Sequence, residues 1–378
     1  MADSIDTSGK SSIEILKGER HDMIAQAILN ILSTEIAQST FAQIVDGLPL
    51  PSVLEDTYVG SDLEPDHPLF SHESLCPGVL QKTKELLEKF DVKNLKFDTS
   101  VEHAHQPGSS SLKARFFELI AVAVHKIAKW LYRLDSKGHQ DETIETWVPP
   151  KNKDWAWCWD HHPRGPYPTL FKHRYYFDYE KYPDGVADMV GYWAETRVLG
   201  GVILFDRKAK PPSDAVFIHP DREAVTYRVC ELTEEQKTDL IMFLLTPSSE
   251  RGSPQCPLPI TPNESNTHRI DPEEPISWTG VYRDIWEREP HPDELGDGRC
   301  RDVWCKGDEV NFLTFEAYQE ARGRYFSSAP SLPCASLGSV TTIRNTHLLH
   351  HLQHSPHVVL RDMLSVGAGH DALKSAIL

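Results

Sequence analysis

The chain has 378 residues, and its hydrophobic fraction of 39% is sufficient for a sizeable buried core. Its 39 Lys and Arg residues face 56 Asp and Glu residues, so the net charge of −17 opposes nucleic-acid phosphates and anionic membrane surfaces alike. We therefore expect neither nucleic acid nor membrane as a partner. Seven scattered cysteines without a Cys-x-x-Cys pair, and a polar N-terminus without an export signal, favour a reduced, cytoplasmic protein.

Residues 1–134 are predicted to form a helical region. Apolar side chains recur at helical spacing from Ile13 to Ile36, with a break near Gly18, and again from Leu80 to Phe90. Repeated prolines between residues 49 and 77 exclude a long helix or a central strand there.

A third helix is predicted from Leu112 to Leu134. Its middle, from Phe116 to Val124, is apolar nearly all round except at Glu118, which indicates a helix buried on more than one side. His125 follows this apolar stretch directly, and we expect it to be a core histidine with a backbone partner.

The polar residues 135–146 are predicted to join the helical region to an aromatic-rich α+β region, residues 147–330. Residues 198–205 have the composition of a buried strand, and residues 215–219 and 224–229 are predicted to form a hairpin. Consecutive strands flanked by helices favour an α+β fold, with the helical N-terminal region packed on a mainly antiparallel sheet.

Two further features support this outline. Thr233 and Gln236 have capping-box spacing directly before an apolar run, which predicts a helix start. Residues 271–297 are strongly acidic apart from Arg283 and Arg288, and we expect them to form a solvated surface.

Residues 331–378 are predicted to be a weakly ordered, histidine-rich tail. His347, His350, His351 and His354 have helical i, i+4 spacing, but the tail has few residues that could form a core. Cys300 and Cys305 have no further ligands nearby. We expect no functional metal site, and because phosphate-binding and dinucleotide-binding signatures are absent, no cofactor.

The most unusual segment places Trp155, Trp157 and Trp159 on alternate residues. In an extended chain these rings share one face, about 7 Å apart, and form either a core wall or a platform for a ligand. His161 and His162 follow at once, where we expect a strand to end and a loop to begin, and Arg164 lies two residues further on.

Residues 182–207 resemble a segment of uncharacterised filamentous-fungal proteins, and the resemblance extends loosely over residues 147–246, including His219-Pro-Asp-Arg and Thr226-Tyr-Arg. It implies a fungal source, and proteins restricted to such lineages sometimes belong to secondary-metabolite gene clusters. It implies no activity and no catalytic residue.

The same segment concentrates polar groups around Trp193. If residues 186–196 are helical, Asp188, Tyr192 and Glu195 share one face. A carboxylate beside an aromatic wall can act as a general acid or base, and Arg197 could anchor an anionic substrate. The alternative is that Glu195 and Arg197 form ordinary ion pairs while Tyr192 and Trp193 fill the core.

These features predict an accessory protein of secondary metabolism that binds an apolar or aromatic small molecule on the tryptophan platform. If it is an enzyme, we expect cofactor-independent isomerisation, cyclisation or dehydration. The candidate catalytic side chains are His161 or His162 as base, with Glu195 or Asp188 as acid, beside Tyr192. The candidate substrate-binding residues are Trp155, Trp157, Trp159, Arg164, Trp193 and Arg197. The alternative is a noncatalytic protein–protein interaction protein.

Overall fold

The structure, a computed structural model, describes about half of the chain. The described residues are 10–12, 19–54, 56–57, 67–92, 95–98, 112–134, 139, 144, 147, 167–210, 213–222, 225–246, 256–263, 265–270, 272 and 274–288. The chain divides into two compact units, residues 1–328 and 329–378, and every described residue belongs to the first. The tryptophan segment and the histidine-rich tail therefore lie outside the described residues.

The described part of the chain is mainly helical before residue 134, and further helices accompany the strands after it. In chain order the helices are α1 (Glu19–Leu32), α2 (Glu35–Asp46), α3 (Pro51–Leu54), α4 (Val79–Glu88), α6 (Leu112–Arg133), α9 (Val186–Leu199), α10 (Glu234–Leu245) and α11 (Ile276–Thr279). Two 3-10 turns, η3 (Pro68–Ser71) and η6 (Tyr179–Lys181), accompany them.

The first helical stretch is divided at a position that the periodicity does not reveal. α1 ends at Leu32, and the side chain of Thr34 accepts a hydrogen bond from the backbone N–H of Ala37 to cap a second helix, α2. α2 ends where Gly47 adopts a left-handed φ of 101°. The predicted break near Gly18 lies outside the described residues.

Five short strands form a sheet in the order β6-β5-β4-β3-β7, and every neighbouring pair is antiparallel. The strands are β3 (Val202–Asp206), β4 (Val216–His219), β5 (Val229–Glu231), β6 (Arg269–Ile270) and β7 (Val281–Tyr282). A separate antiparallel pair joins β1 (Lys10–Ser12) to β2 (Lys96–Asp98). The predicted α+β class, with a helical N-terminal region and an antiparallel sheet, is confirmed.

Several helices and strands begin or end at other residues than the sequence predicts. Val198 and Leu199 complete α9 instead of starting a strand, because Gly200 turns the chain with a φ of 101° and packs so closely on the Ile260 carbonyl that no side chain fits. The predicted hairpin forms, but its second strand starts only at Val229. The capping box at Thr233 is confirmed by both of its hydrogen bonds.

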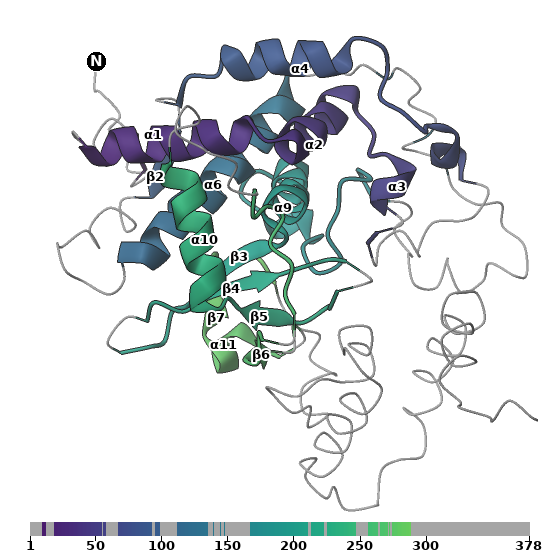
Figure 1. The fold of residues 1–378 in the computed structure, drawn as a ribbon. Helices are drawn as coiled ribbons and strands as arrows, with labels where there is room; N and C mark the ends of the chain where they lie inside the picture. Colours follow the sequence, from purple (N-terminus) through teal and green to yellow (C-terminus); the bar gives the residue numbers. More distant parts are fainter. Residues whose placement is uncertain are drawn as a thin grey trace, which may run out of the picture. The chain divides into compact units, whose positions relative to one another are not determined.

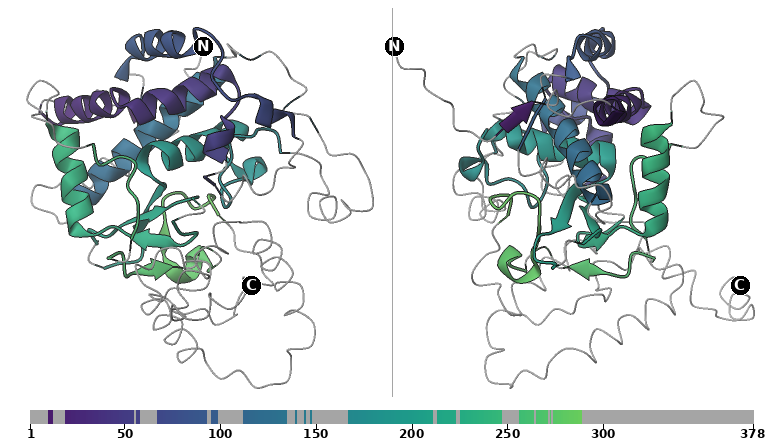
Figure 2. Two further views of the ribbon diagram at one scale, coloured as in Figure 1. Left: turned by 45° about the vertical axis from the view of Figure 1, so that its right-hand side comes forward. Right: turned by 90° about the vertical axis from the view of Figure 1, so that its left-hand side faces the viewer.

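Strand β3 separates two cores. Its Ile203 and Phe205 pack into the larger core with the helices, whereas Val202 and Leu204 join a second, tyrosine-rich core. In Figures 1 and 2, α1, α2, α6 and α9 gather on one side of the sheet, and α10 runs along its flank. α9 is central: twelve of its fourteen residues are buried, so it contributes to both cores.

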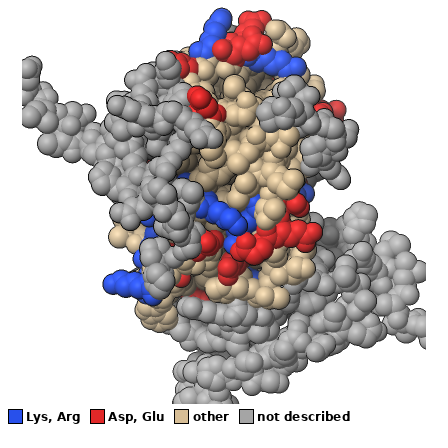
Figure 3. Space-filling view, turned by 60° about the vertical axis from the view of Figure 1, so that its left-hand side comes forward, with Lys and Arg blue, Asp and Glu red and all other residues tan. Residues whose placement is uncertain are grey.

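Among the described residues, no helix combines the length and apolarity needed to cross a bilayer. On the face drawn in Figure 3, acidic and basic side chains intermingle in bands around a neutral surface. No broad basic surface is visible on that face.

Candidate functional site

The predicted face of α9 lies against α6, and its carboxylates meet side chains that lie outside the segment from which they were predicted. Asp188 and Glu195 both approach His125, which α6 supplies from across the helix interface. Together with Lys129 and Arg283 these residues form a buried charged group that we call the α6–α9 cluster. All five are at most 9% exposed.

His125 is held between two carboxylates. Its Nδ1 lies 2.7 Å from Glu195 Oε1, and its Nε2 lies 3.1 Å from Asp188 Oδ1. Each ring nitrogen therefore has a carboxylate oxygen within hydrogen-bonding distance. The expectation of a backbone partner for His125 is wrong, because the charged face of α9 occupies the space around the ring.

Gly191 makes this placement sterically feasible. A β-carbon at this position would lie 2.5 Å from ring atoms of His125, well inside van der Waals contact. Glycine within a helix costs about 1 kcal/mol relative to alanine. Here it opens the space that the imidazole needs.

Asp188 connects the cluster to the edge of the molecule. Its carboxylate accepts hydrogen bonds from Lys129 and from the backbone N–H of Asp184, the latter at 2.8 Å. Lys129 also pairs with Asp184, which pairs in turn with Arg133. Burial alone would raise the pKa of Asp188, but hydrogen bonds and charge from His125 and Lys129 outweigh it and hold that pKa well below its usual range.

Arg283 closes the inner end of the cluster. Its Nη1 donates to Glu195 Oε2 at 2.7 Å, and both side chains are at most 3% exposed. The expectation that residues 271–297 form a solvated surface is wrong at this point, because Arg283, Glu287 and Arg288 are all buried. Burial would lower the pKa of Arg283, but Glu195 and Asp284 hold it well above its usual range.

Three tyrosines form an aromatic wall beside the cluster. The ring of Tyr192 contacts His125 edge-on at a centroid distance of 4.7 Å, and Tyr176 and Tyr182 pack against Tyr192 at 4.7 and 5.6 Å. Burial raises the pKa of all three phenols, so they stay neutral. An aromatic wall therefore lies near the predicted acids Asp188 and Glu195, and tyrosine side chains form it.

Two other predicted residues face away from the cluster. Trp193 packs against Phe171 in the larger core, and Arg197 pairs with Asp56 at 3.1 Å. The remaining predicted site residues lie outside the described residues: Trp155, Trp157, Trp159, His161, His162 and Arg164.

His173 and His219 form a buried pair of their own, with ring centroids 4.9 Å apart. His173 donates from Nε2 to the His219 carbonyl and accepts at Nδ1 from the Tyr175 amide. Burial lowers the pKa of His173 to about 3 and that of His219 well below its usual range. Both rings are therefore neutral and buried, and they meet where the middle strand β4 ends.

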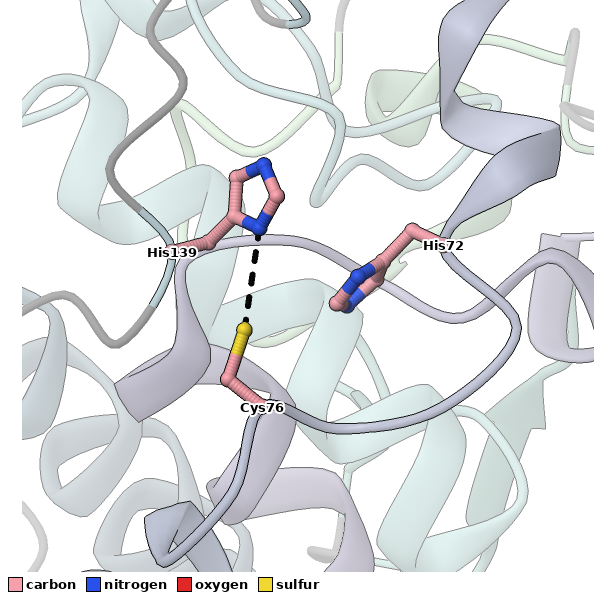
Figure 4. A group of neighbouring side chains, drawn as sticks. All are labelled: His72, Cys76 and His139. Atoms are coloured by element: carbon pink, nitrogen blue, oxygen red, sulfur yellow. Dashed lines mark hydrogen bonds between the residues drawn. The ribbon is translucent and has the colours of Figure 1, made fainter.

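A separate group brings together His72, Cys76 and His139, which Figure 4 shows pointing into one space. We call these residues the His72–Cys76–His139 group. Burial, followed by the neighbouring Asp46 carboxylate, raises the pKa of the Cys76 thiol. All three are side chains that bind transition metals.

Sequence patterns missed the residues that complete both groups. Lys129 and Arg283 lie far along the chain from α9, and only folding brings them to Asp188 and Glu195. A weak signal was present at His72 and Cys76, which are four residues apart, but His139 is 63 residues further on. Comparisons with protein-family models, with curated proteins and with solved structures return no match.

Proposed function

We propose that this protein binds a small organic molecule and catalyses proton transfer at the α6–α9 cluster, with His125 as the group that moves the proton. The observation that carries this proposal is the clamping of one imidazole between Glu195 and Asp188, beside the ring of Tyr192. Buried ionisable groups with strongly shifted pKa values concentrate at functional sites, and Asp188 and Arg283 are such groups in this cluster.

The roles of the side chains follow from their contacts. Glu195 is held by Arg283 and fixes His125 at Nδ1, so it is a positioning residue and not the free acid expected from the sequence. The other nitrogen, Nε2, faces Asp188 on the side of the cluster that leads to Asp184 and Arg133. Those two side chains are 37% and 53% exposed, so this end of the network meets solvent.

A substrate would enter at this exposed end. Arg133 and Lys129 suit an anionic group of the substrate, and displacement of the Asp188 contact would free His125 Nε2 for proton exchange. We retain the expected substrate class, an apolar or aromatic molecule, and the expected setting in fungal secondary metabolism. Trp155, Trp157, Trp159, His161, His162 and Arg164 remain proposed contributors to substrate binding and catalysis.

The test is a metabolite comparison in the producing organism, using His125→Gln and Glu195→Gln at the native locus. An amide at position 125 keeps hydrogen-bonding capacity but cannot exchange a proton, so we expect the product to disappear while the protein level stays unchanged. The matched control is His268→Gln, which removes a partly exposed His–Glu pair with the same 2.7 Å separation. Unchanged metabolites in a folded His125→Gln strain would reject the proposal.

One observation favours the alternative of a noncatalytic interaction protein. Trp278, Ile285 and Trp286 are large apolar side chains that are 58%, 67% and 38% exposed. Replacing Trp278 and Ile285 by Ser separates the two proposals. If the protein is an enzyme, the strain with both Ser substitutions should still make the product. If it is an interaction protein, that strain should lose the wild-type phenotype, whereas the His125→Gln strain should keep it.

A further inference from the structure

Three side chains with metal-binding chemistry converge where the end of α2 meets the segment after η3. His72 follows η3 directly, Cys76 precedes α4, and His139 comes from a distant part of the chain. Their candidate ligand atoms all lie within 4.8 Å of one another, and Cys76 Sγ lies 3.7 Å from His139 Nδ1. The two imidazole rings are 5.1 Å apart between centroids.

Asp46, the last residue of α2, organises this group. Its Oδ2 accepts a hydrogen bond from the Cys76 backbone N–H at 3.0 Å and lies 3.1 Å from His72 Nε2. Its backbone carbonyl accepts from the His139 N–H at 2.7 Å. One residue therefore contacts all three members of the group, and its side chain is fully buried.

The group leaves buried polar atoms without hydrogen-bond partners among the described residues. These atoms are Asp46 Oδ1, His72 Nε2 and His139 Nε2, the second of which lies near Asp46 at angles unsuited to a hydrogen bond. A buried polar atom without a partner costs about 1–3 kcal/mol. His139 Nε2 points away from Cys76, so the unpartnered atoms that bear on the group are Asp46 Oδ1 and His72 Nε2. A carboxylate oxygen and an imidazole nitrogen in this state beside a thiol suit a bound cation.

We propose that His72, Cys76 and His139 bind one zinc ion, and that Asp46 positions these ligands from just outside the metal. This inference departs from the sequence-based expectation of no functional metal site, and it is independent of the proposed chemistry at His125. Thiolate with two imidazoles is a ligand set that zinc takes, and three protein ligands leave a fourth position for water or a substrate.

The geometry requires only a small adjustment. Tetrahedral zinc, with bonds of about 2.0–2.3 Å, holds its ligand atoms roughly 3.3–3.8 Å apart. The ligand atoms lie within 4.8 Å of one another, so the longest separation must shorten by at most about 1.5 Å, which side-chain rotations can provide. On binding, the Cys76 thiol loses its proton to solvent, and the thiolate becomes a metal ligand.

The experiment uses the full-length chain, stripped with a chelator, reduced, and titrated with Co²⁺ as a spectroscopic substitute for zinc. We expect binding to saturate at one Co²⁺ ion per chain. The bound ion should show a thiolate-to-cobalt charge-transfer band and visible d–d bands as intense as those of tetrahedral Co²⁺. Zn²⁺ should displace the cobalt and remove both signals. If the wild-type chain shows no thiolate-to-cobalt band, that result alone overturns the proposal.

Variants assign the ligands. Cys76→Ser should lose the charge-transfer band, and His139→Gln should weaken cobalt binding at least 10-fold. Asp46→Asn should keep the band but bind cobalt 10- to 100-fold more weakly, as for other partners that orient ligands. Cys256→Ser, an exposed free cysteine, is the matched thiol control.

The histidine-rich tail is a competing source of metal affinity and needs its own control. His347→Ala combined with His351→Ala should leave unchanged both the thiolate band and the Co²⁺ concentration at which it reaches half of its final intensity. If the band persists in Cys76→Ser, or disappears in the tail variant, the metal lies elsewhere and the assignment is wrong.

Discussion

The imidazole of His125 lies against the backbone of Gly191, in the space that a β-carbon would need. This contact joins α6 to α9 at the centre of the α6–α9 cluster. A side chain at position 191 would therefore displace the ring from its place between the two carboxylates.

The first prediction concerns Gly191→Ala. Helix propensity alone favours alanine by about 1 kcal/mol, but overpacking a filled core typically costs about 1–3 kcal/mol. We expect a net loss of stability in urea denaturation, together with loss of product if His125 is catalytic. A variant more stable than the wild type would show that His125 moves aside easily and that the cluster is not rigid.

The second prediction concerns the pair of Arg283 and Glu195. Arg283→Met leaves a fully buried carboxylate without its guanidinium partner, and breaking a buried pair in this way costs about 3–5 kcal/mol. Adding Glu195→Gln removes that stranded charge. We expect the double variant to recover part of the loss, with a coupling energy of about 1–3 kcal/mol in a double-mutant cycle. Additive losses would mean that solvent reaches the pair.

The third prediction concerns Glu287, a buried carboxyl whose pKa is raised to about 7 by burial. Its ordinary value is 4.5, so between pH 4.5 and 7 the folded state binds more protons than the unfolded state. Stability should therefore fall as the pH rises through this interval, by up to about 3 kcal/mol. Glu287→Gln should flatten that part of the curve and stabilise the protein above pH 7. A wild-type curve without this decline would contradict the assignment.

The fourth prediction concerns metal and stability. A ligand that binds only the folded state at 100 times its dissociation constant adds about 2.7 kcal/mol. We expect zinc to raise the unfolding temperature of the stripped chain by several degrees and to leave Cys76→Ser unchanged. Calorimetry of both proteins with and without Zn²⁺ measures this, and an equal rise in the variant would argue for nonspecific binding.

The sequence predicted well those features that depend on neighbouring residues. The hydroxyl of Thr233 and the amide of Gln236 are three residues apart, and both capping hydrogen bonds form as expected. The helical spacing of Asp188, Tyr192 and Glu195 likewise placed them on one face, and all three contact His125. Local geometry and side-chain period suffice for such predictions.

Features that depend on distant partners could not be predicted in this way. His125 follows an apolar helix segment, so its burial was foreseeable, but its carboxylate partners lie 63 and 70 residues away. Arg283 lies in an acidic stretch with the composition of a surface, yet it is buried because it neutralises Glu195. His139 reaches His72 and Cys76 from 63 residues beyond Cys76, where its backbone N–H donates to the Asp46 carbonyl at the end of α2.

The alternation along β3 has a consequence for how disturbances spread through the molecule. The side chains on one face of the strand belong to the helical core and those on the other face to the tyrosine-rich core. The β3 backbone therefore separates the packing of the two cores. α9 also contributes to both. A substitution that loosens Ile203 should leave the packing around Tyr176 intact, whereas one in the middle of α9 should soften both cores together.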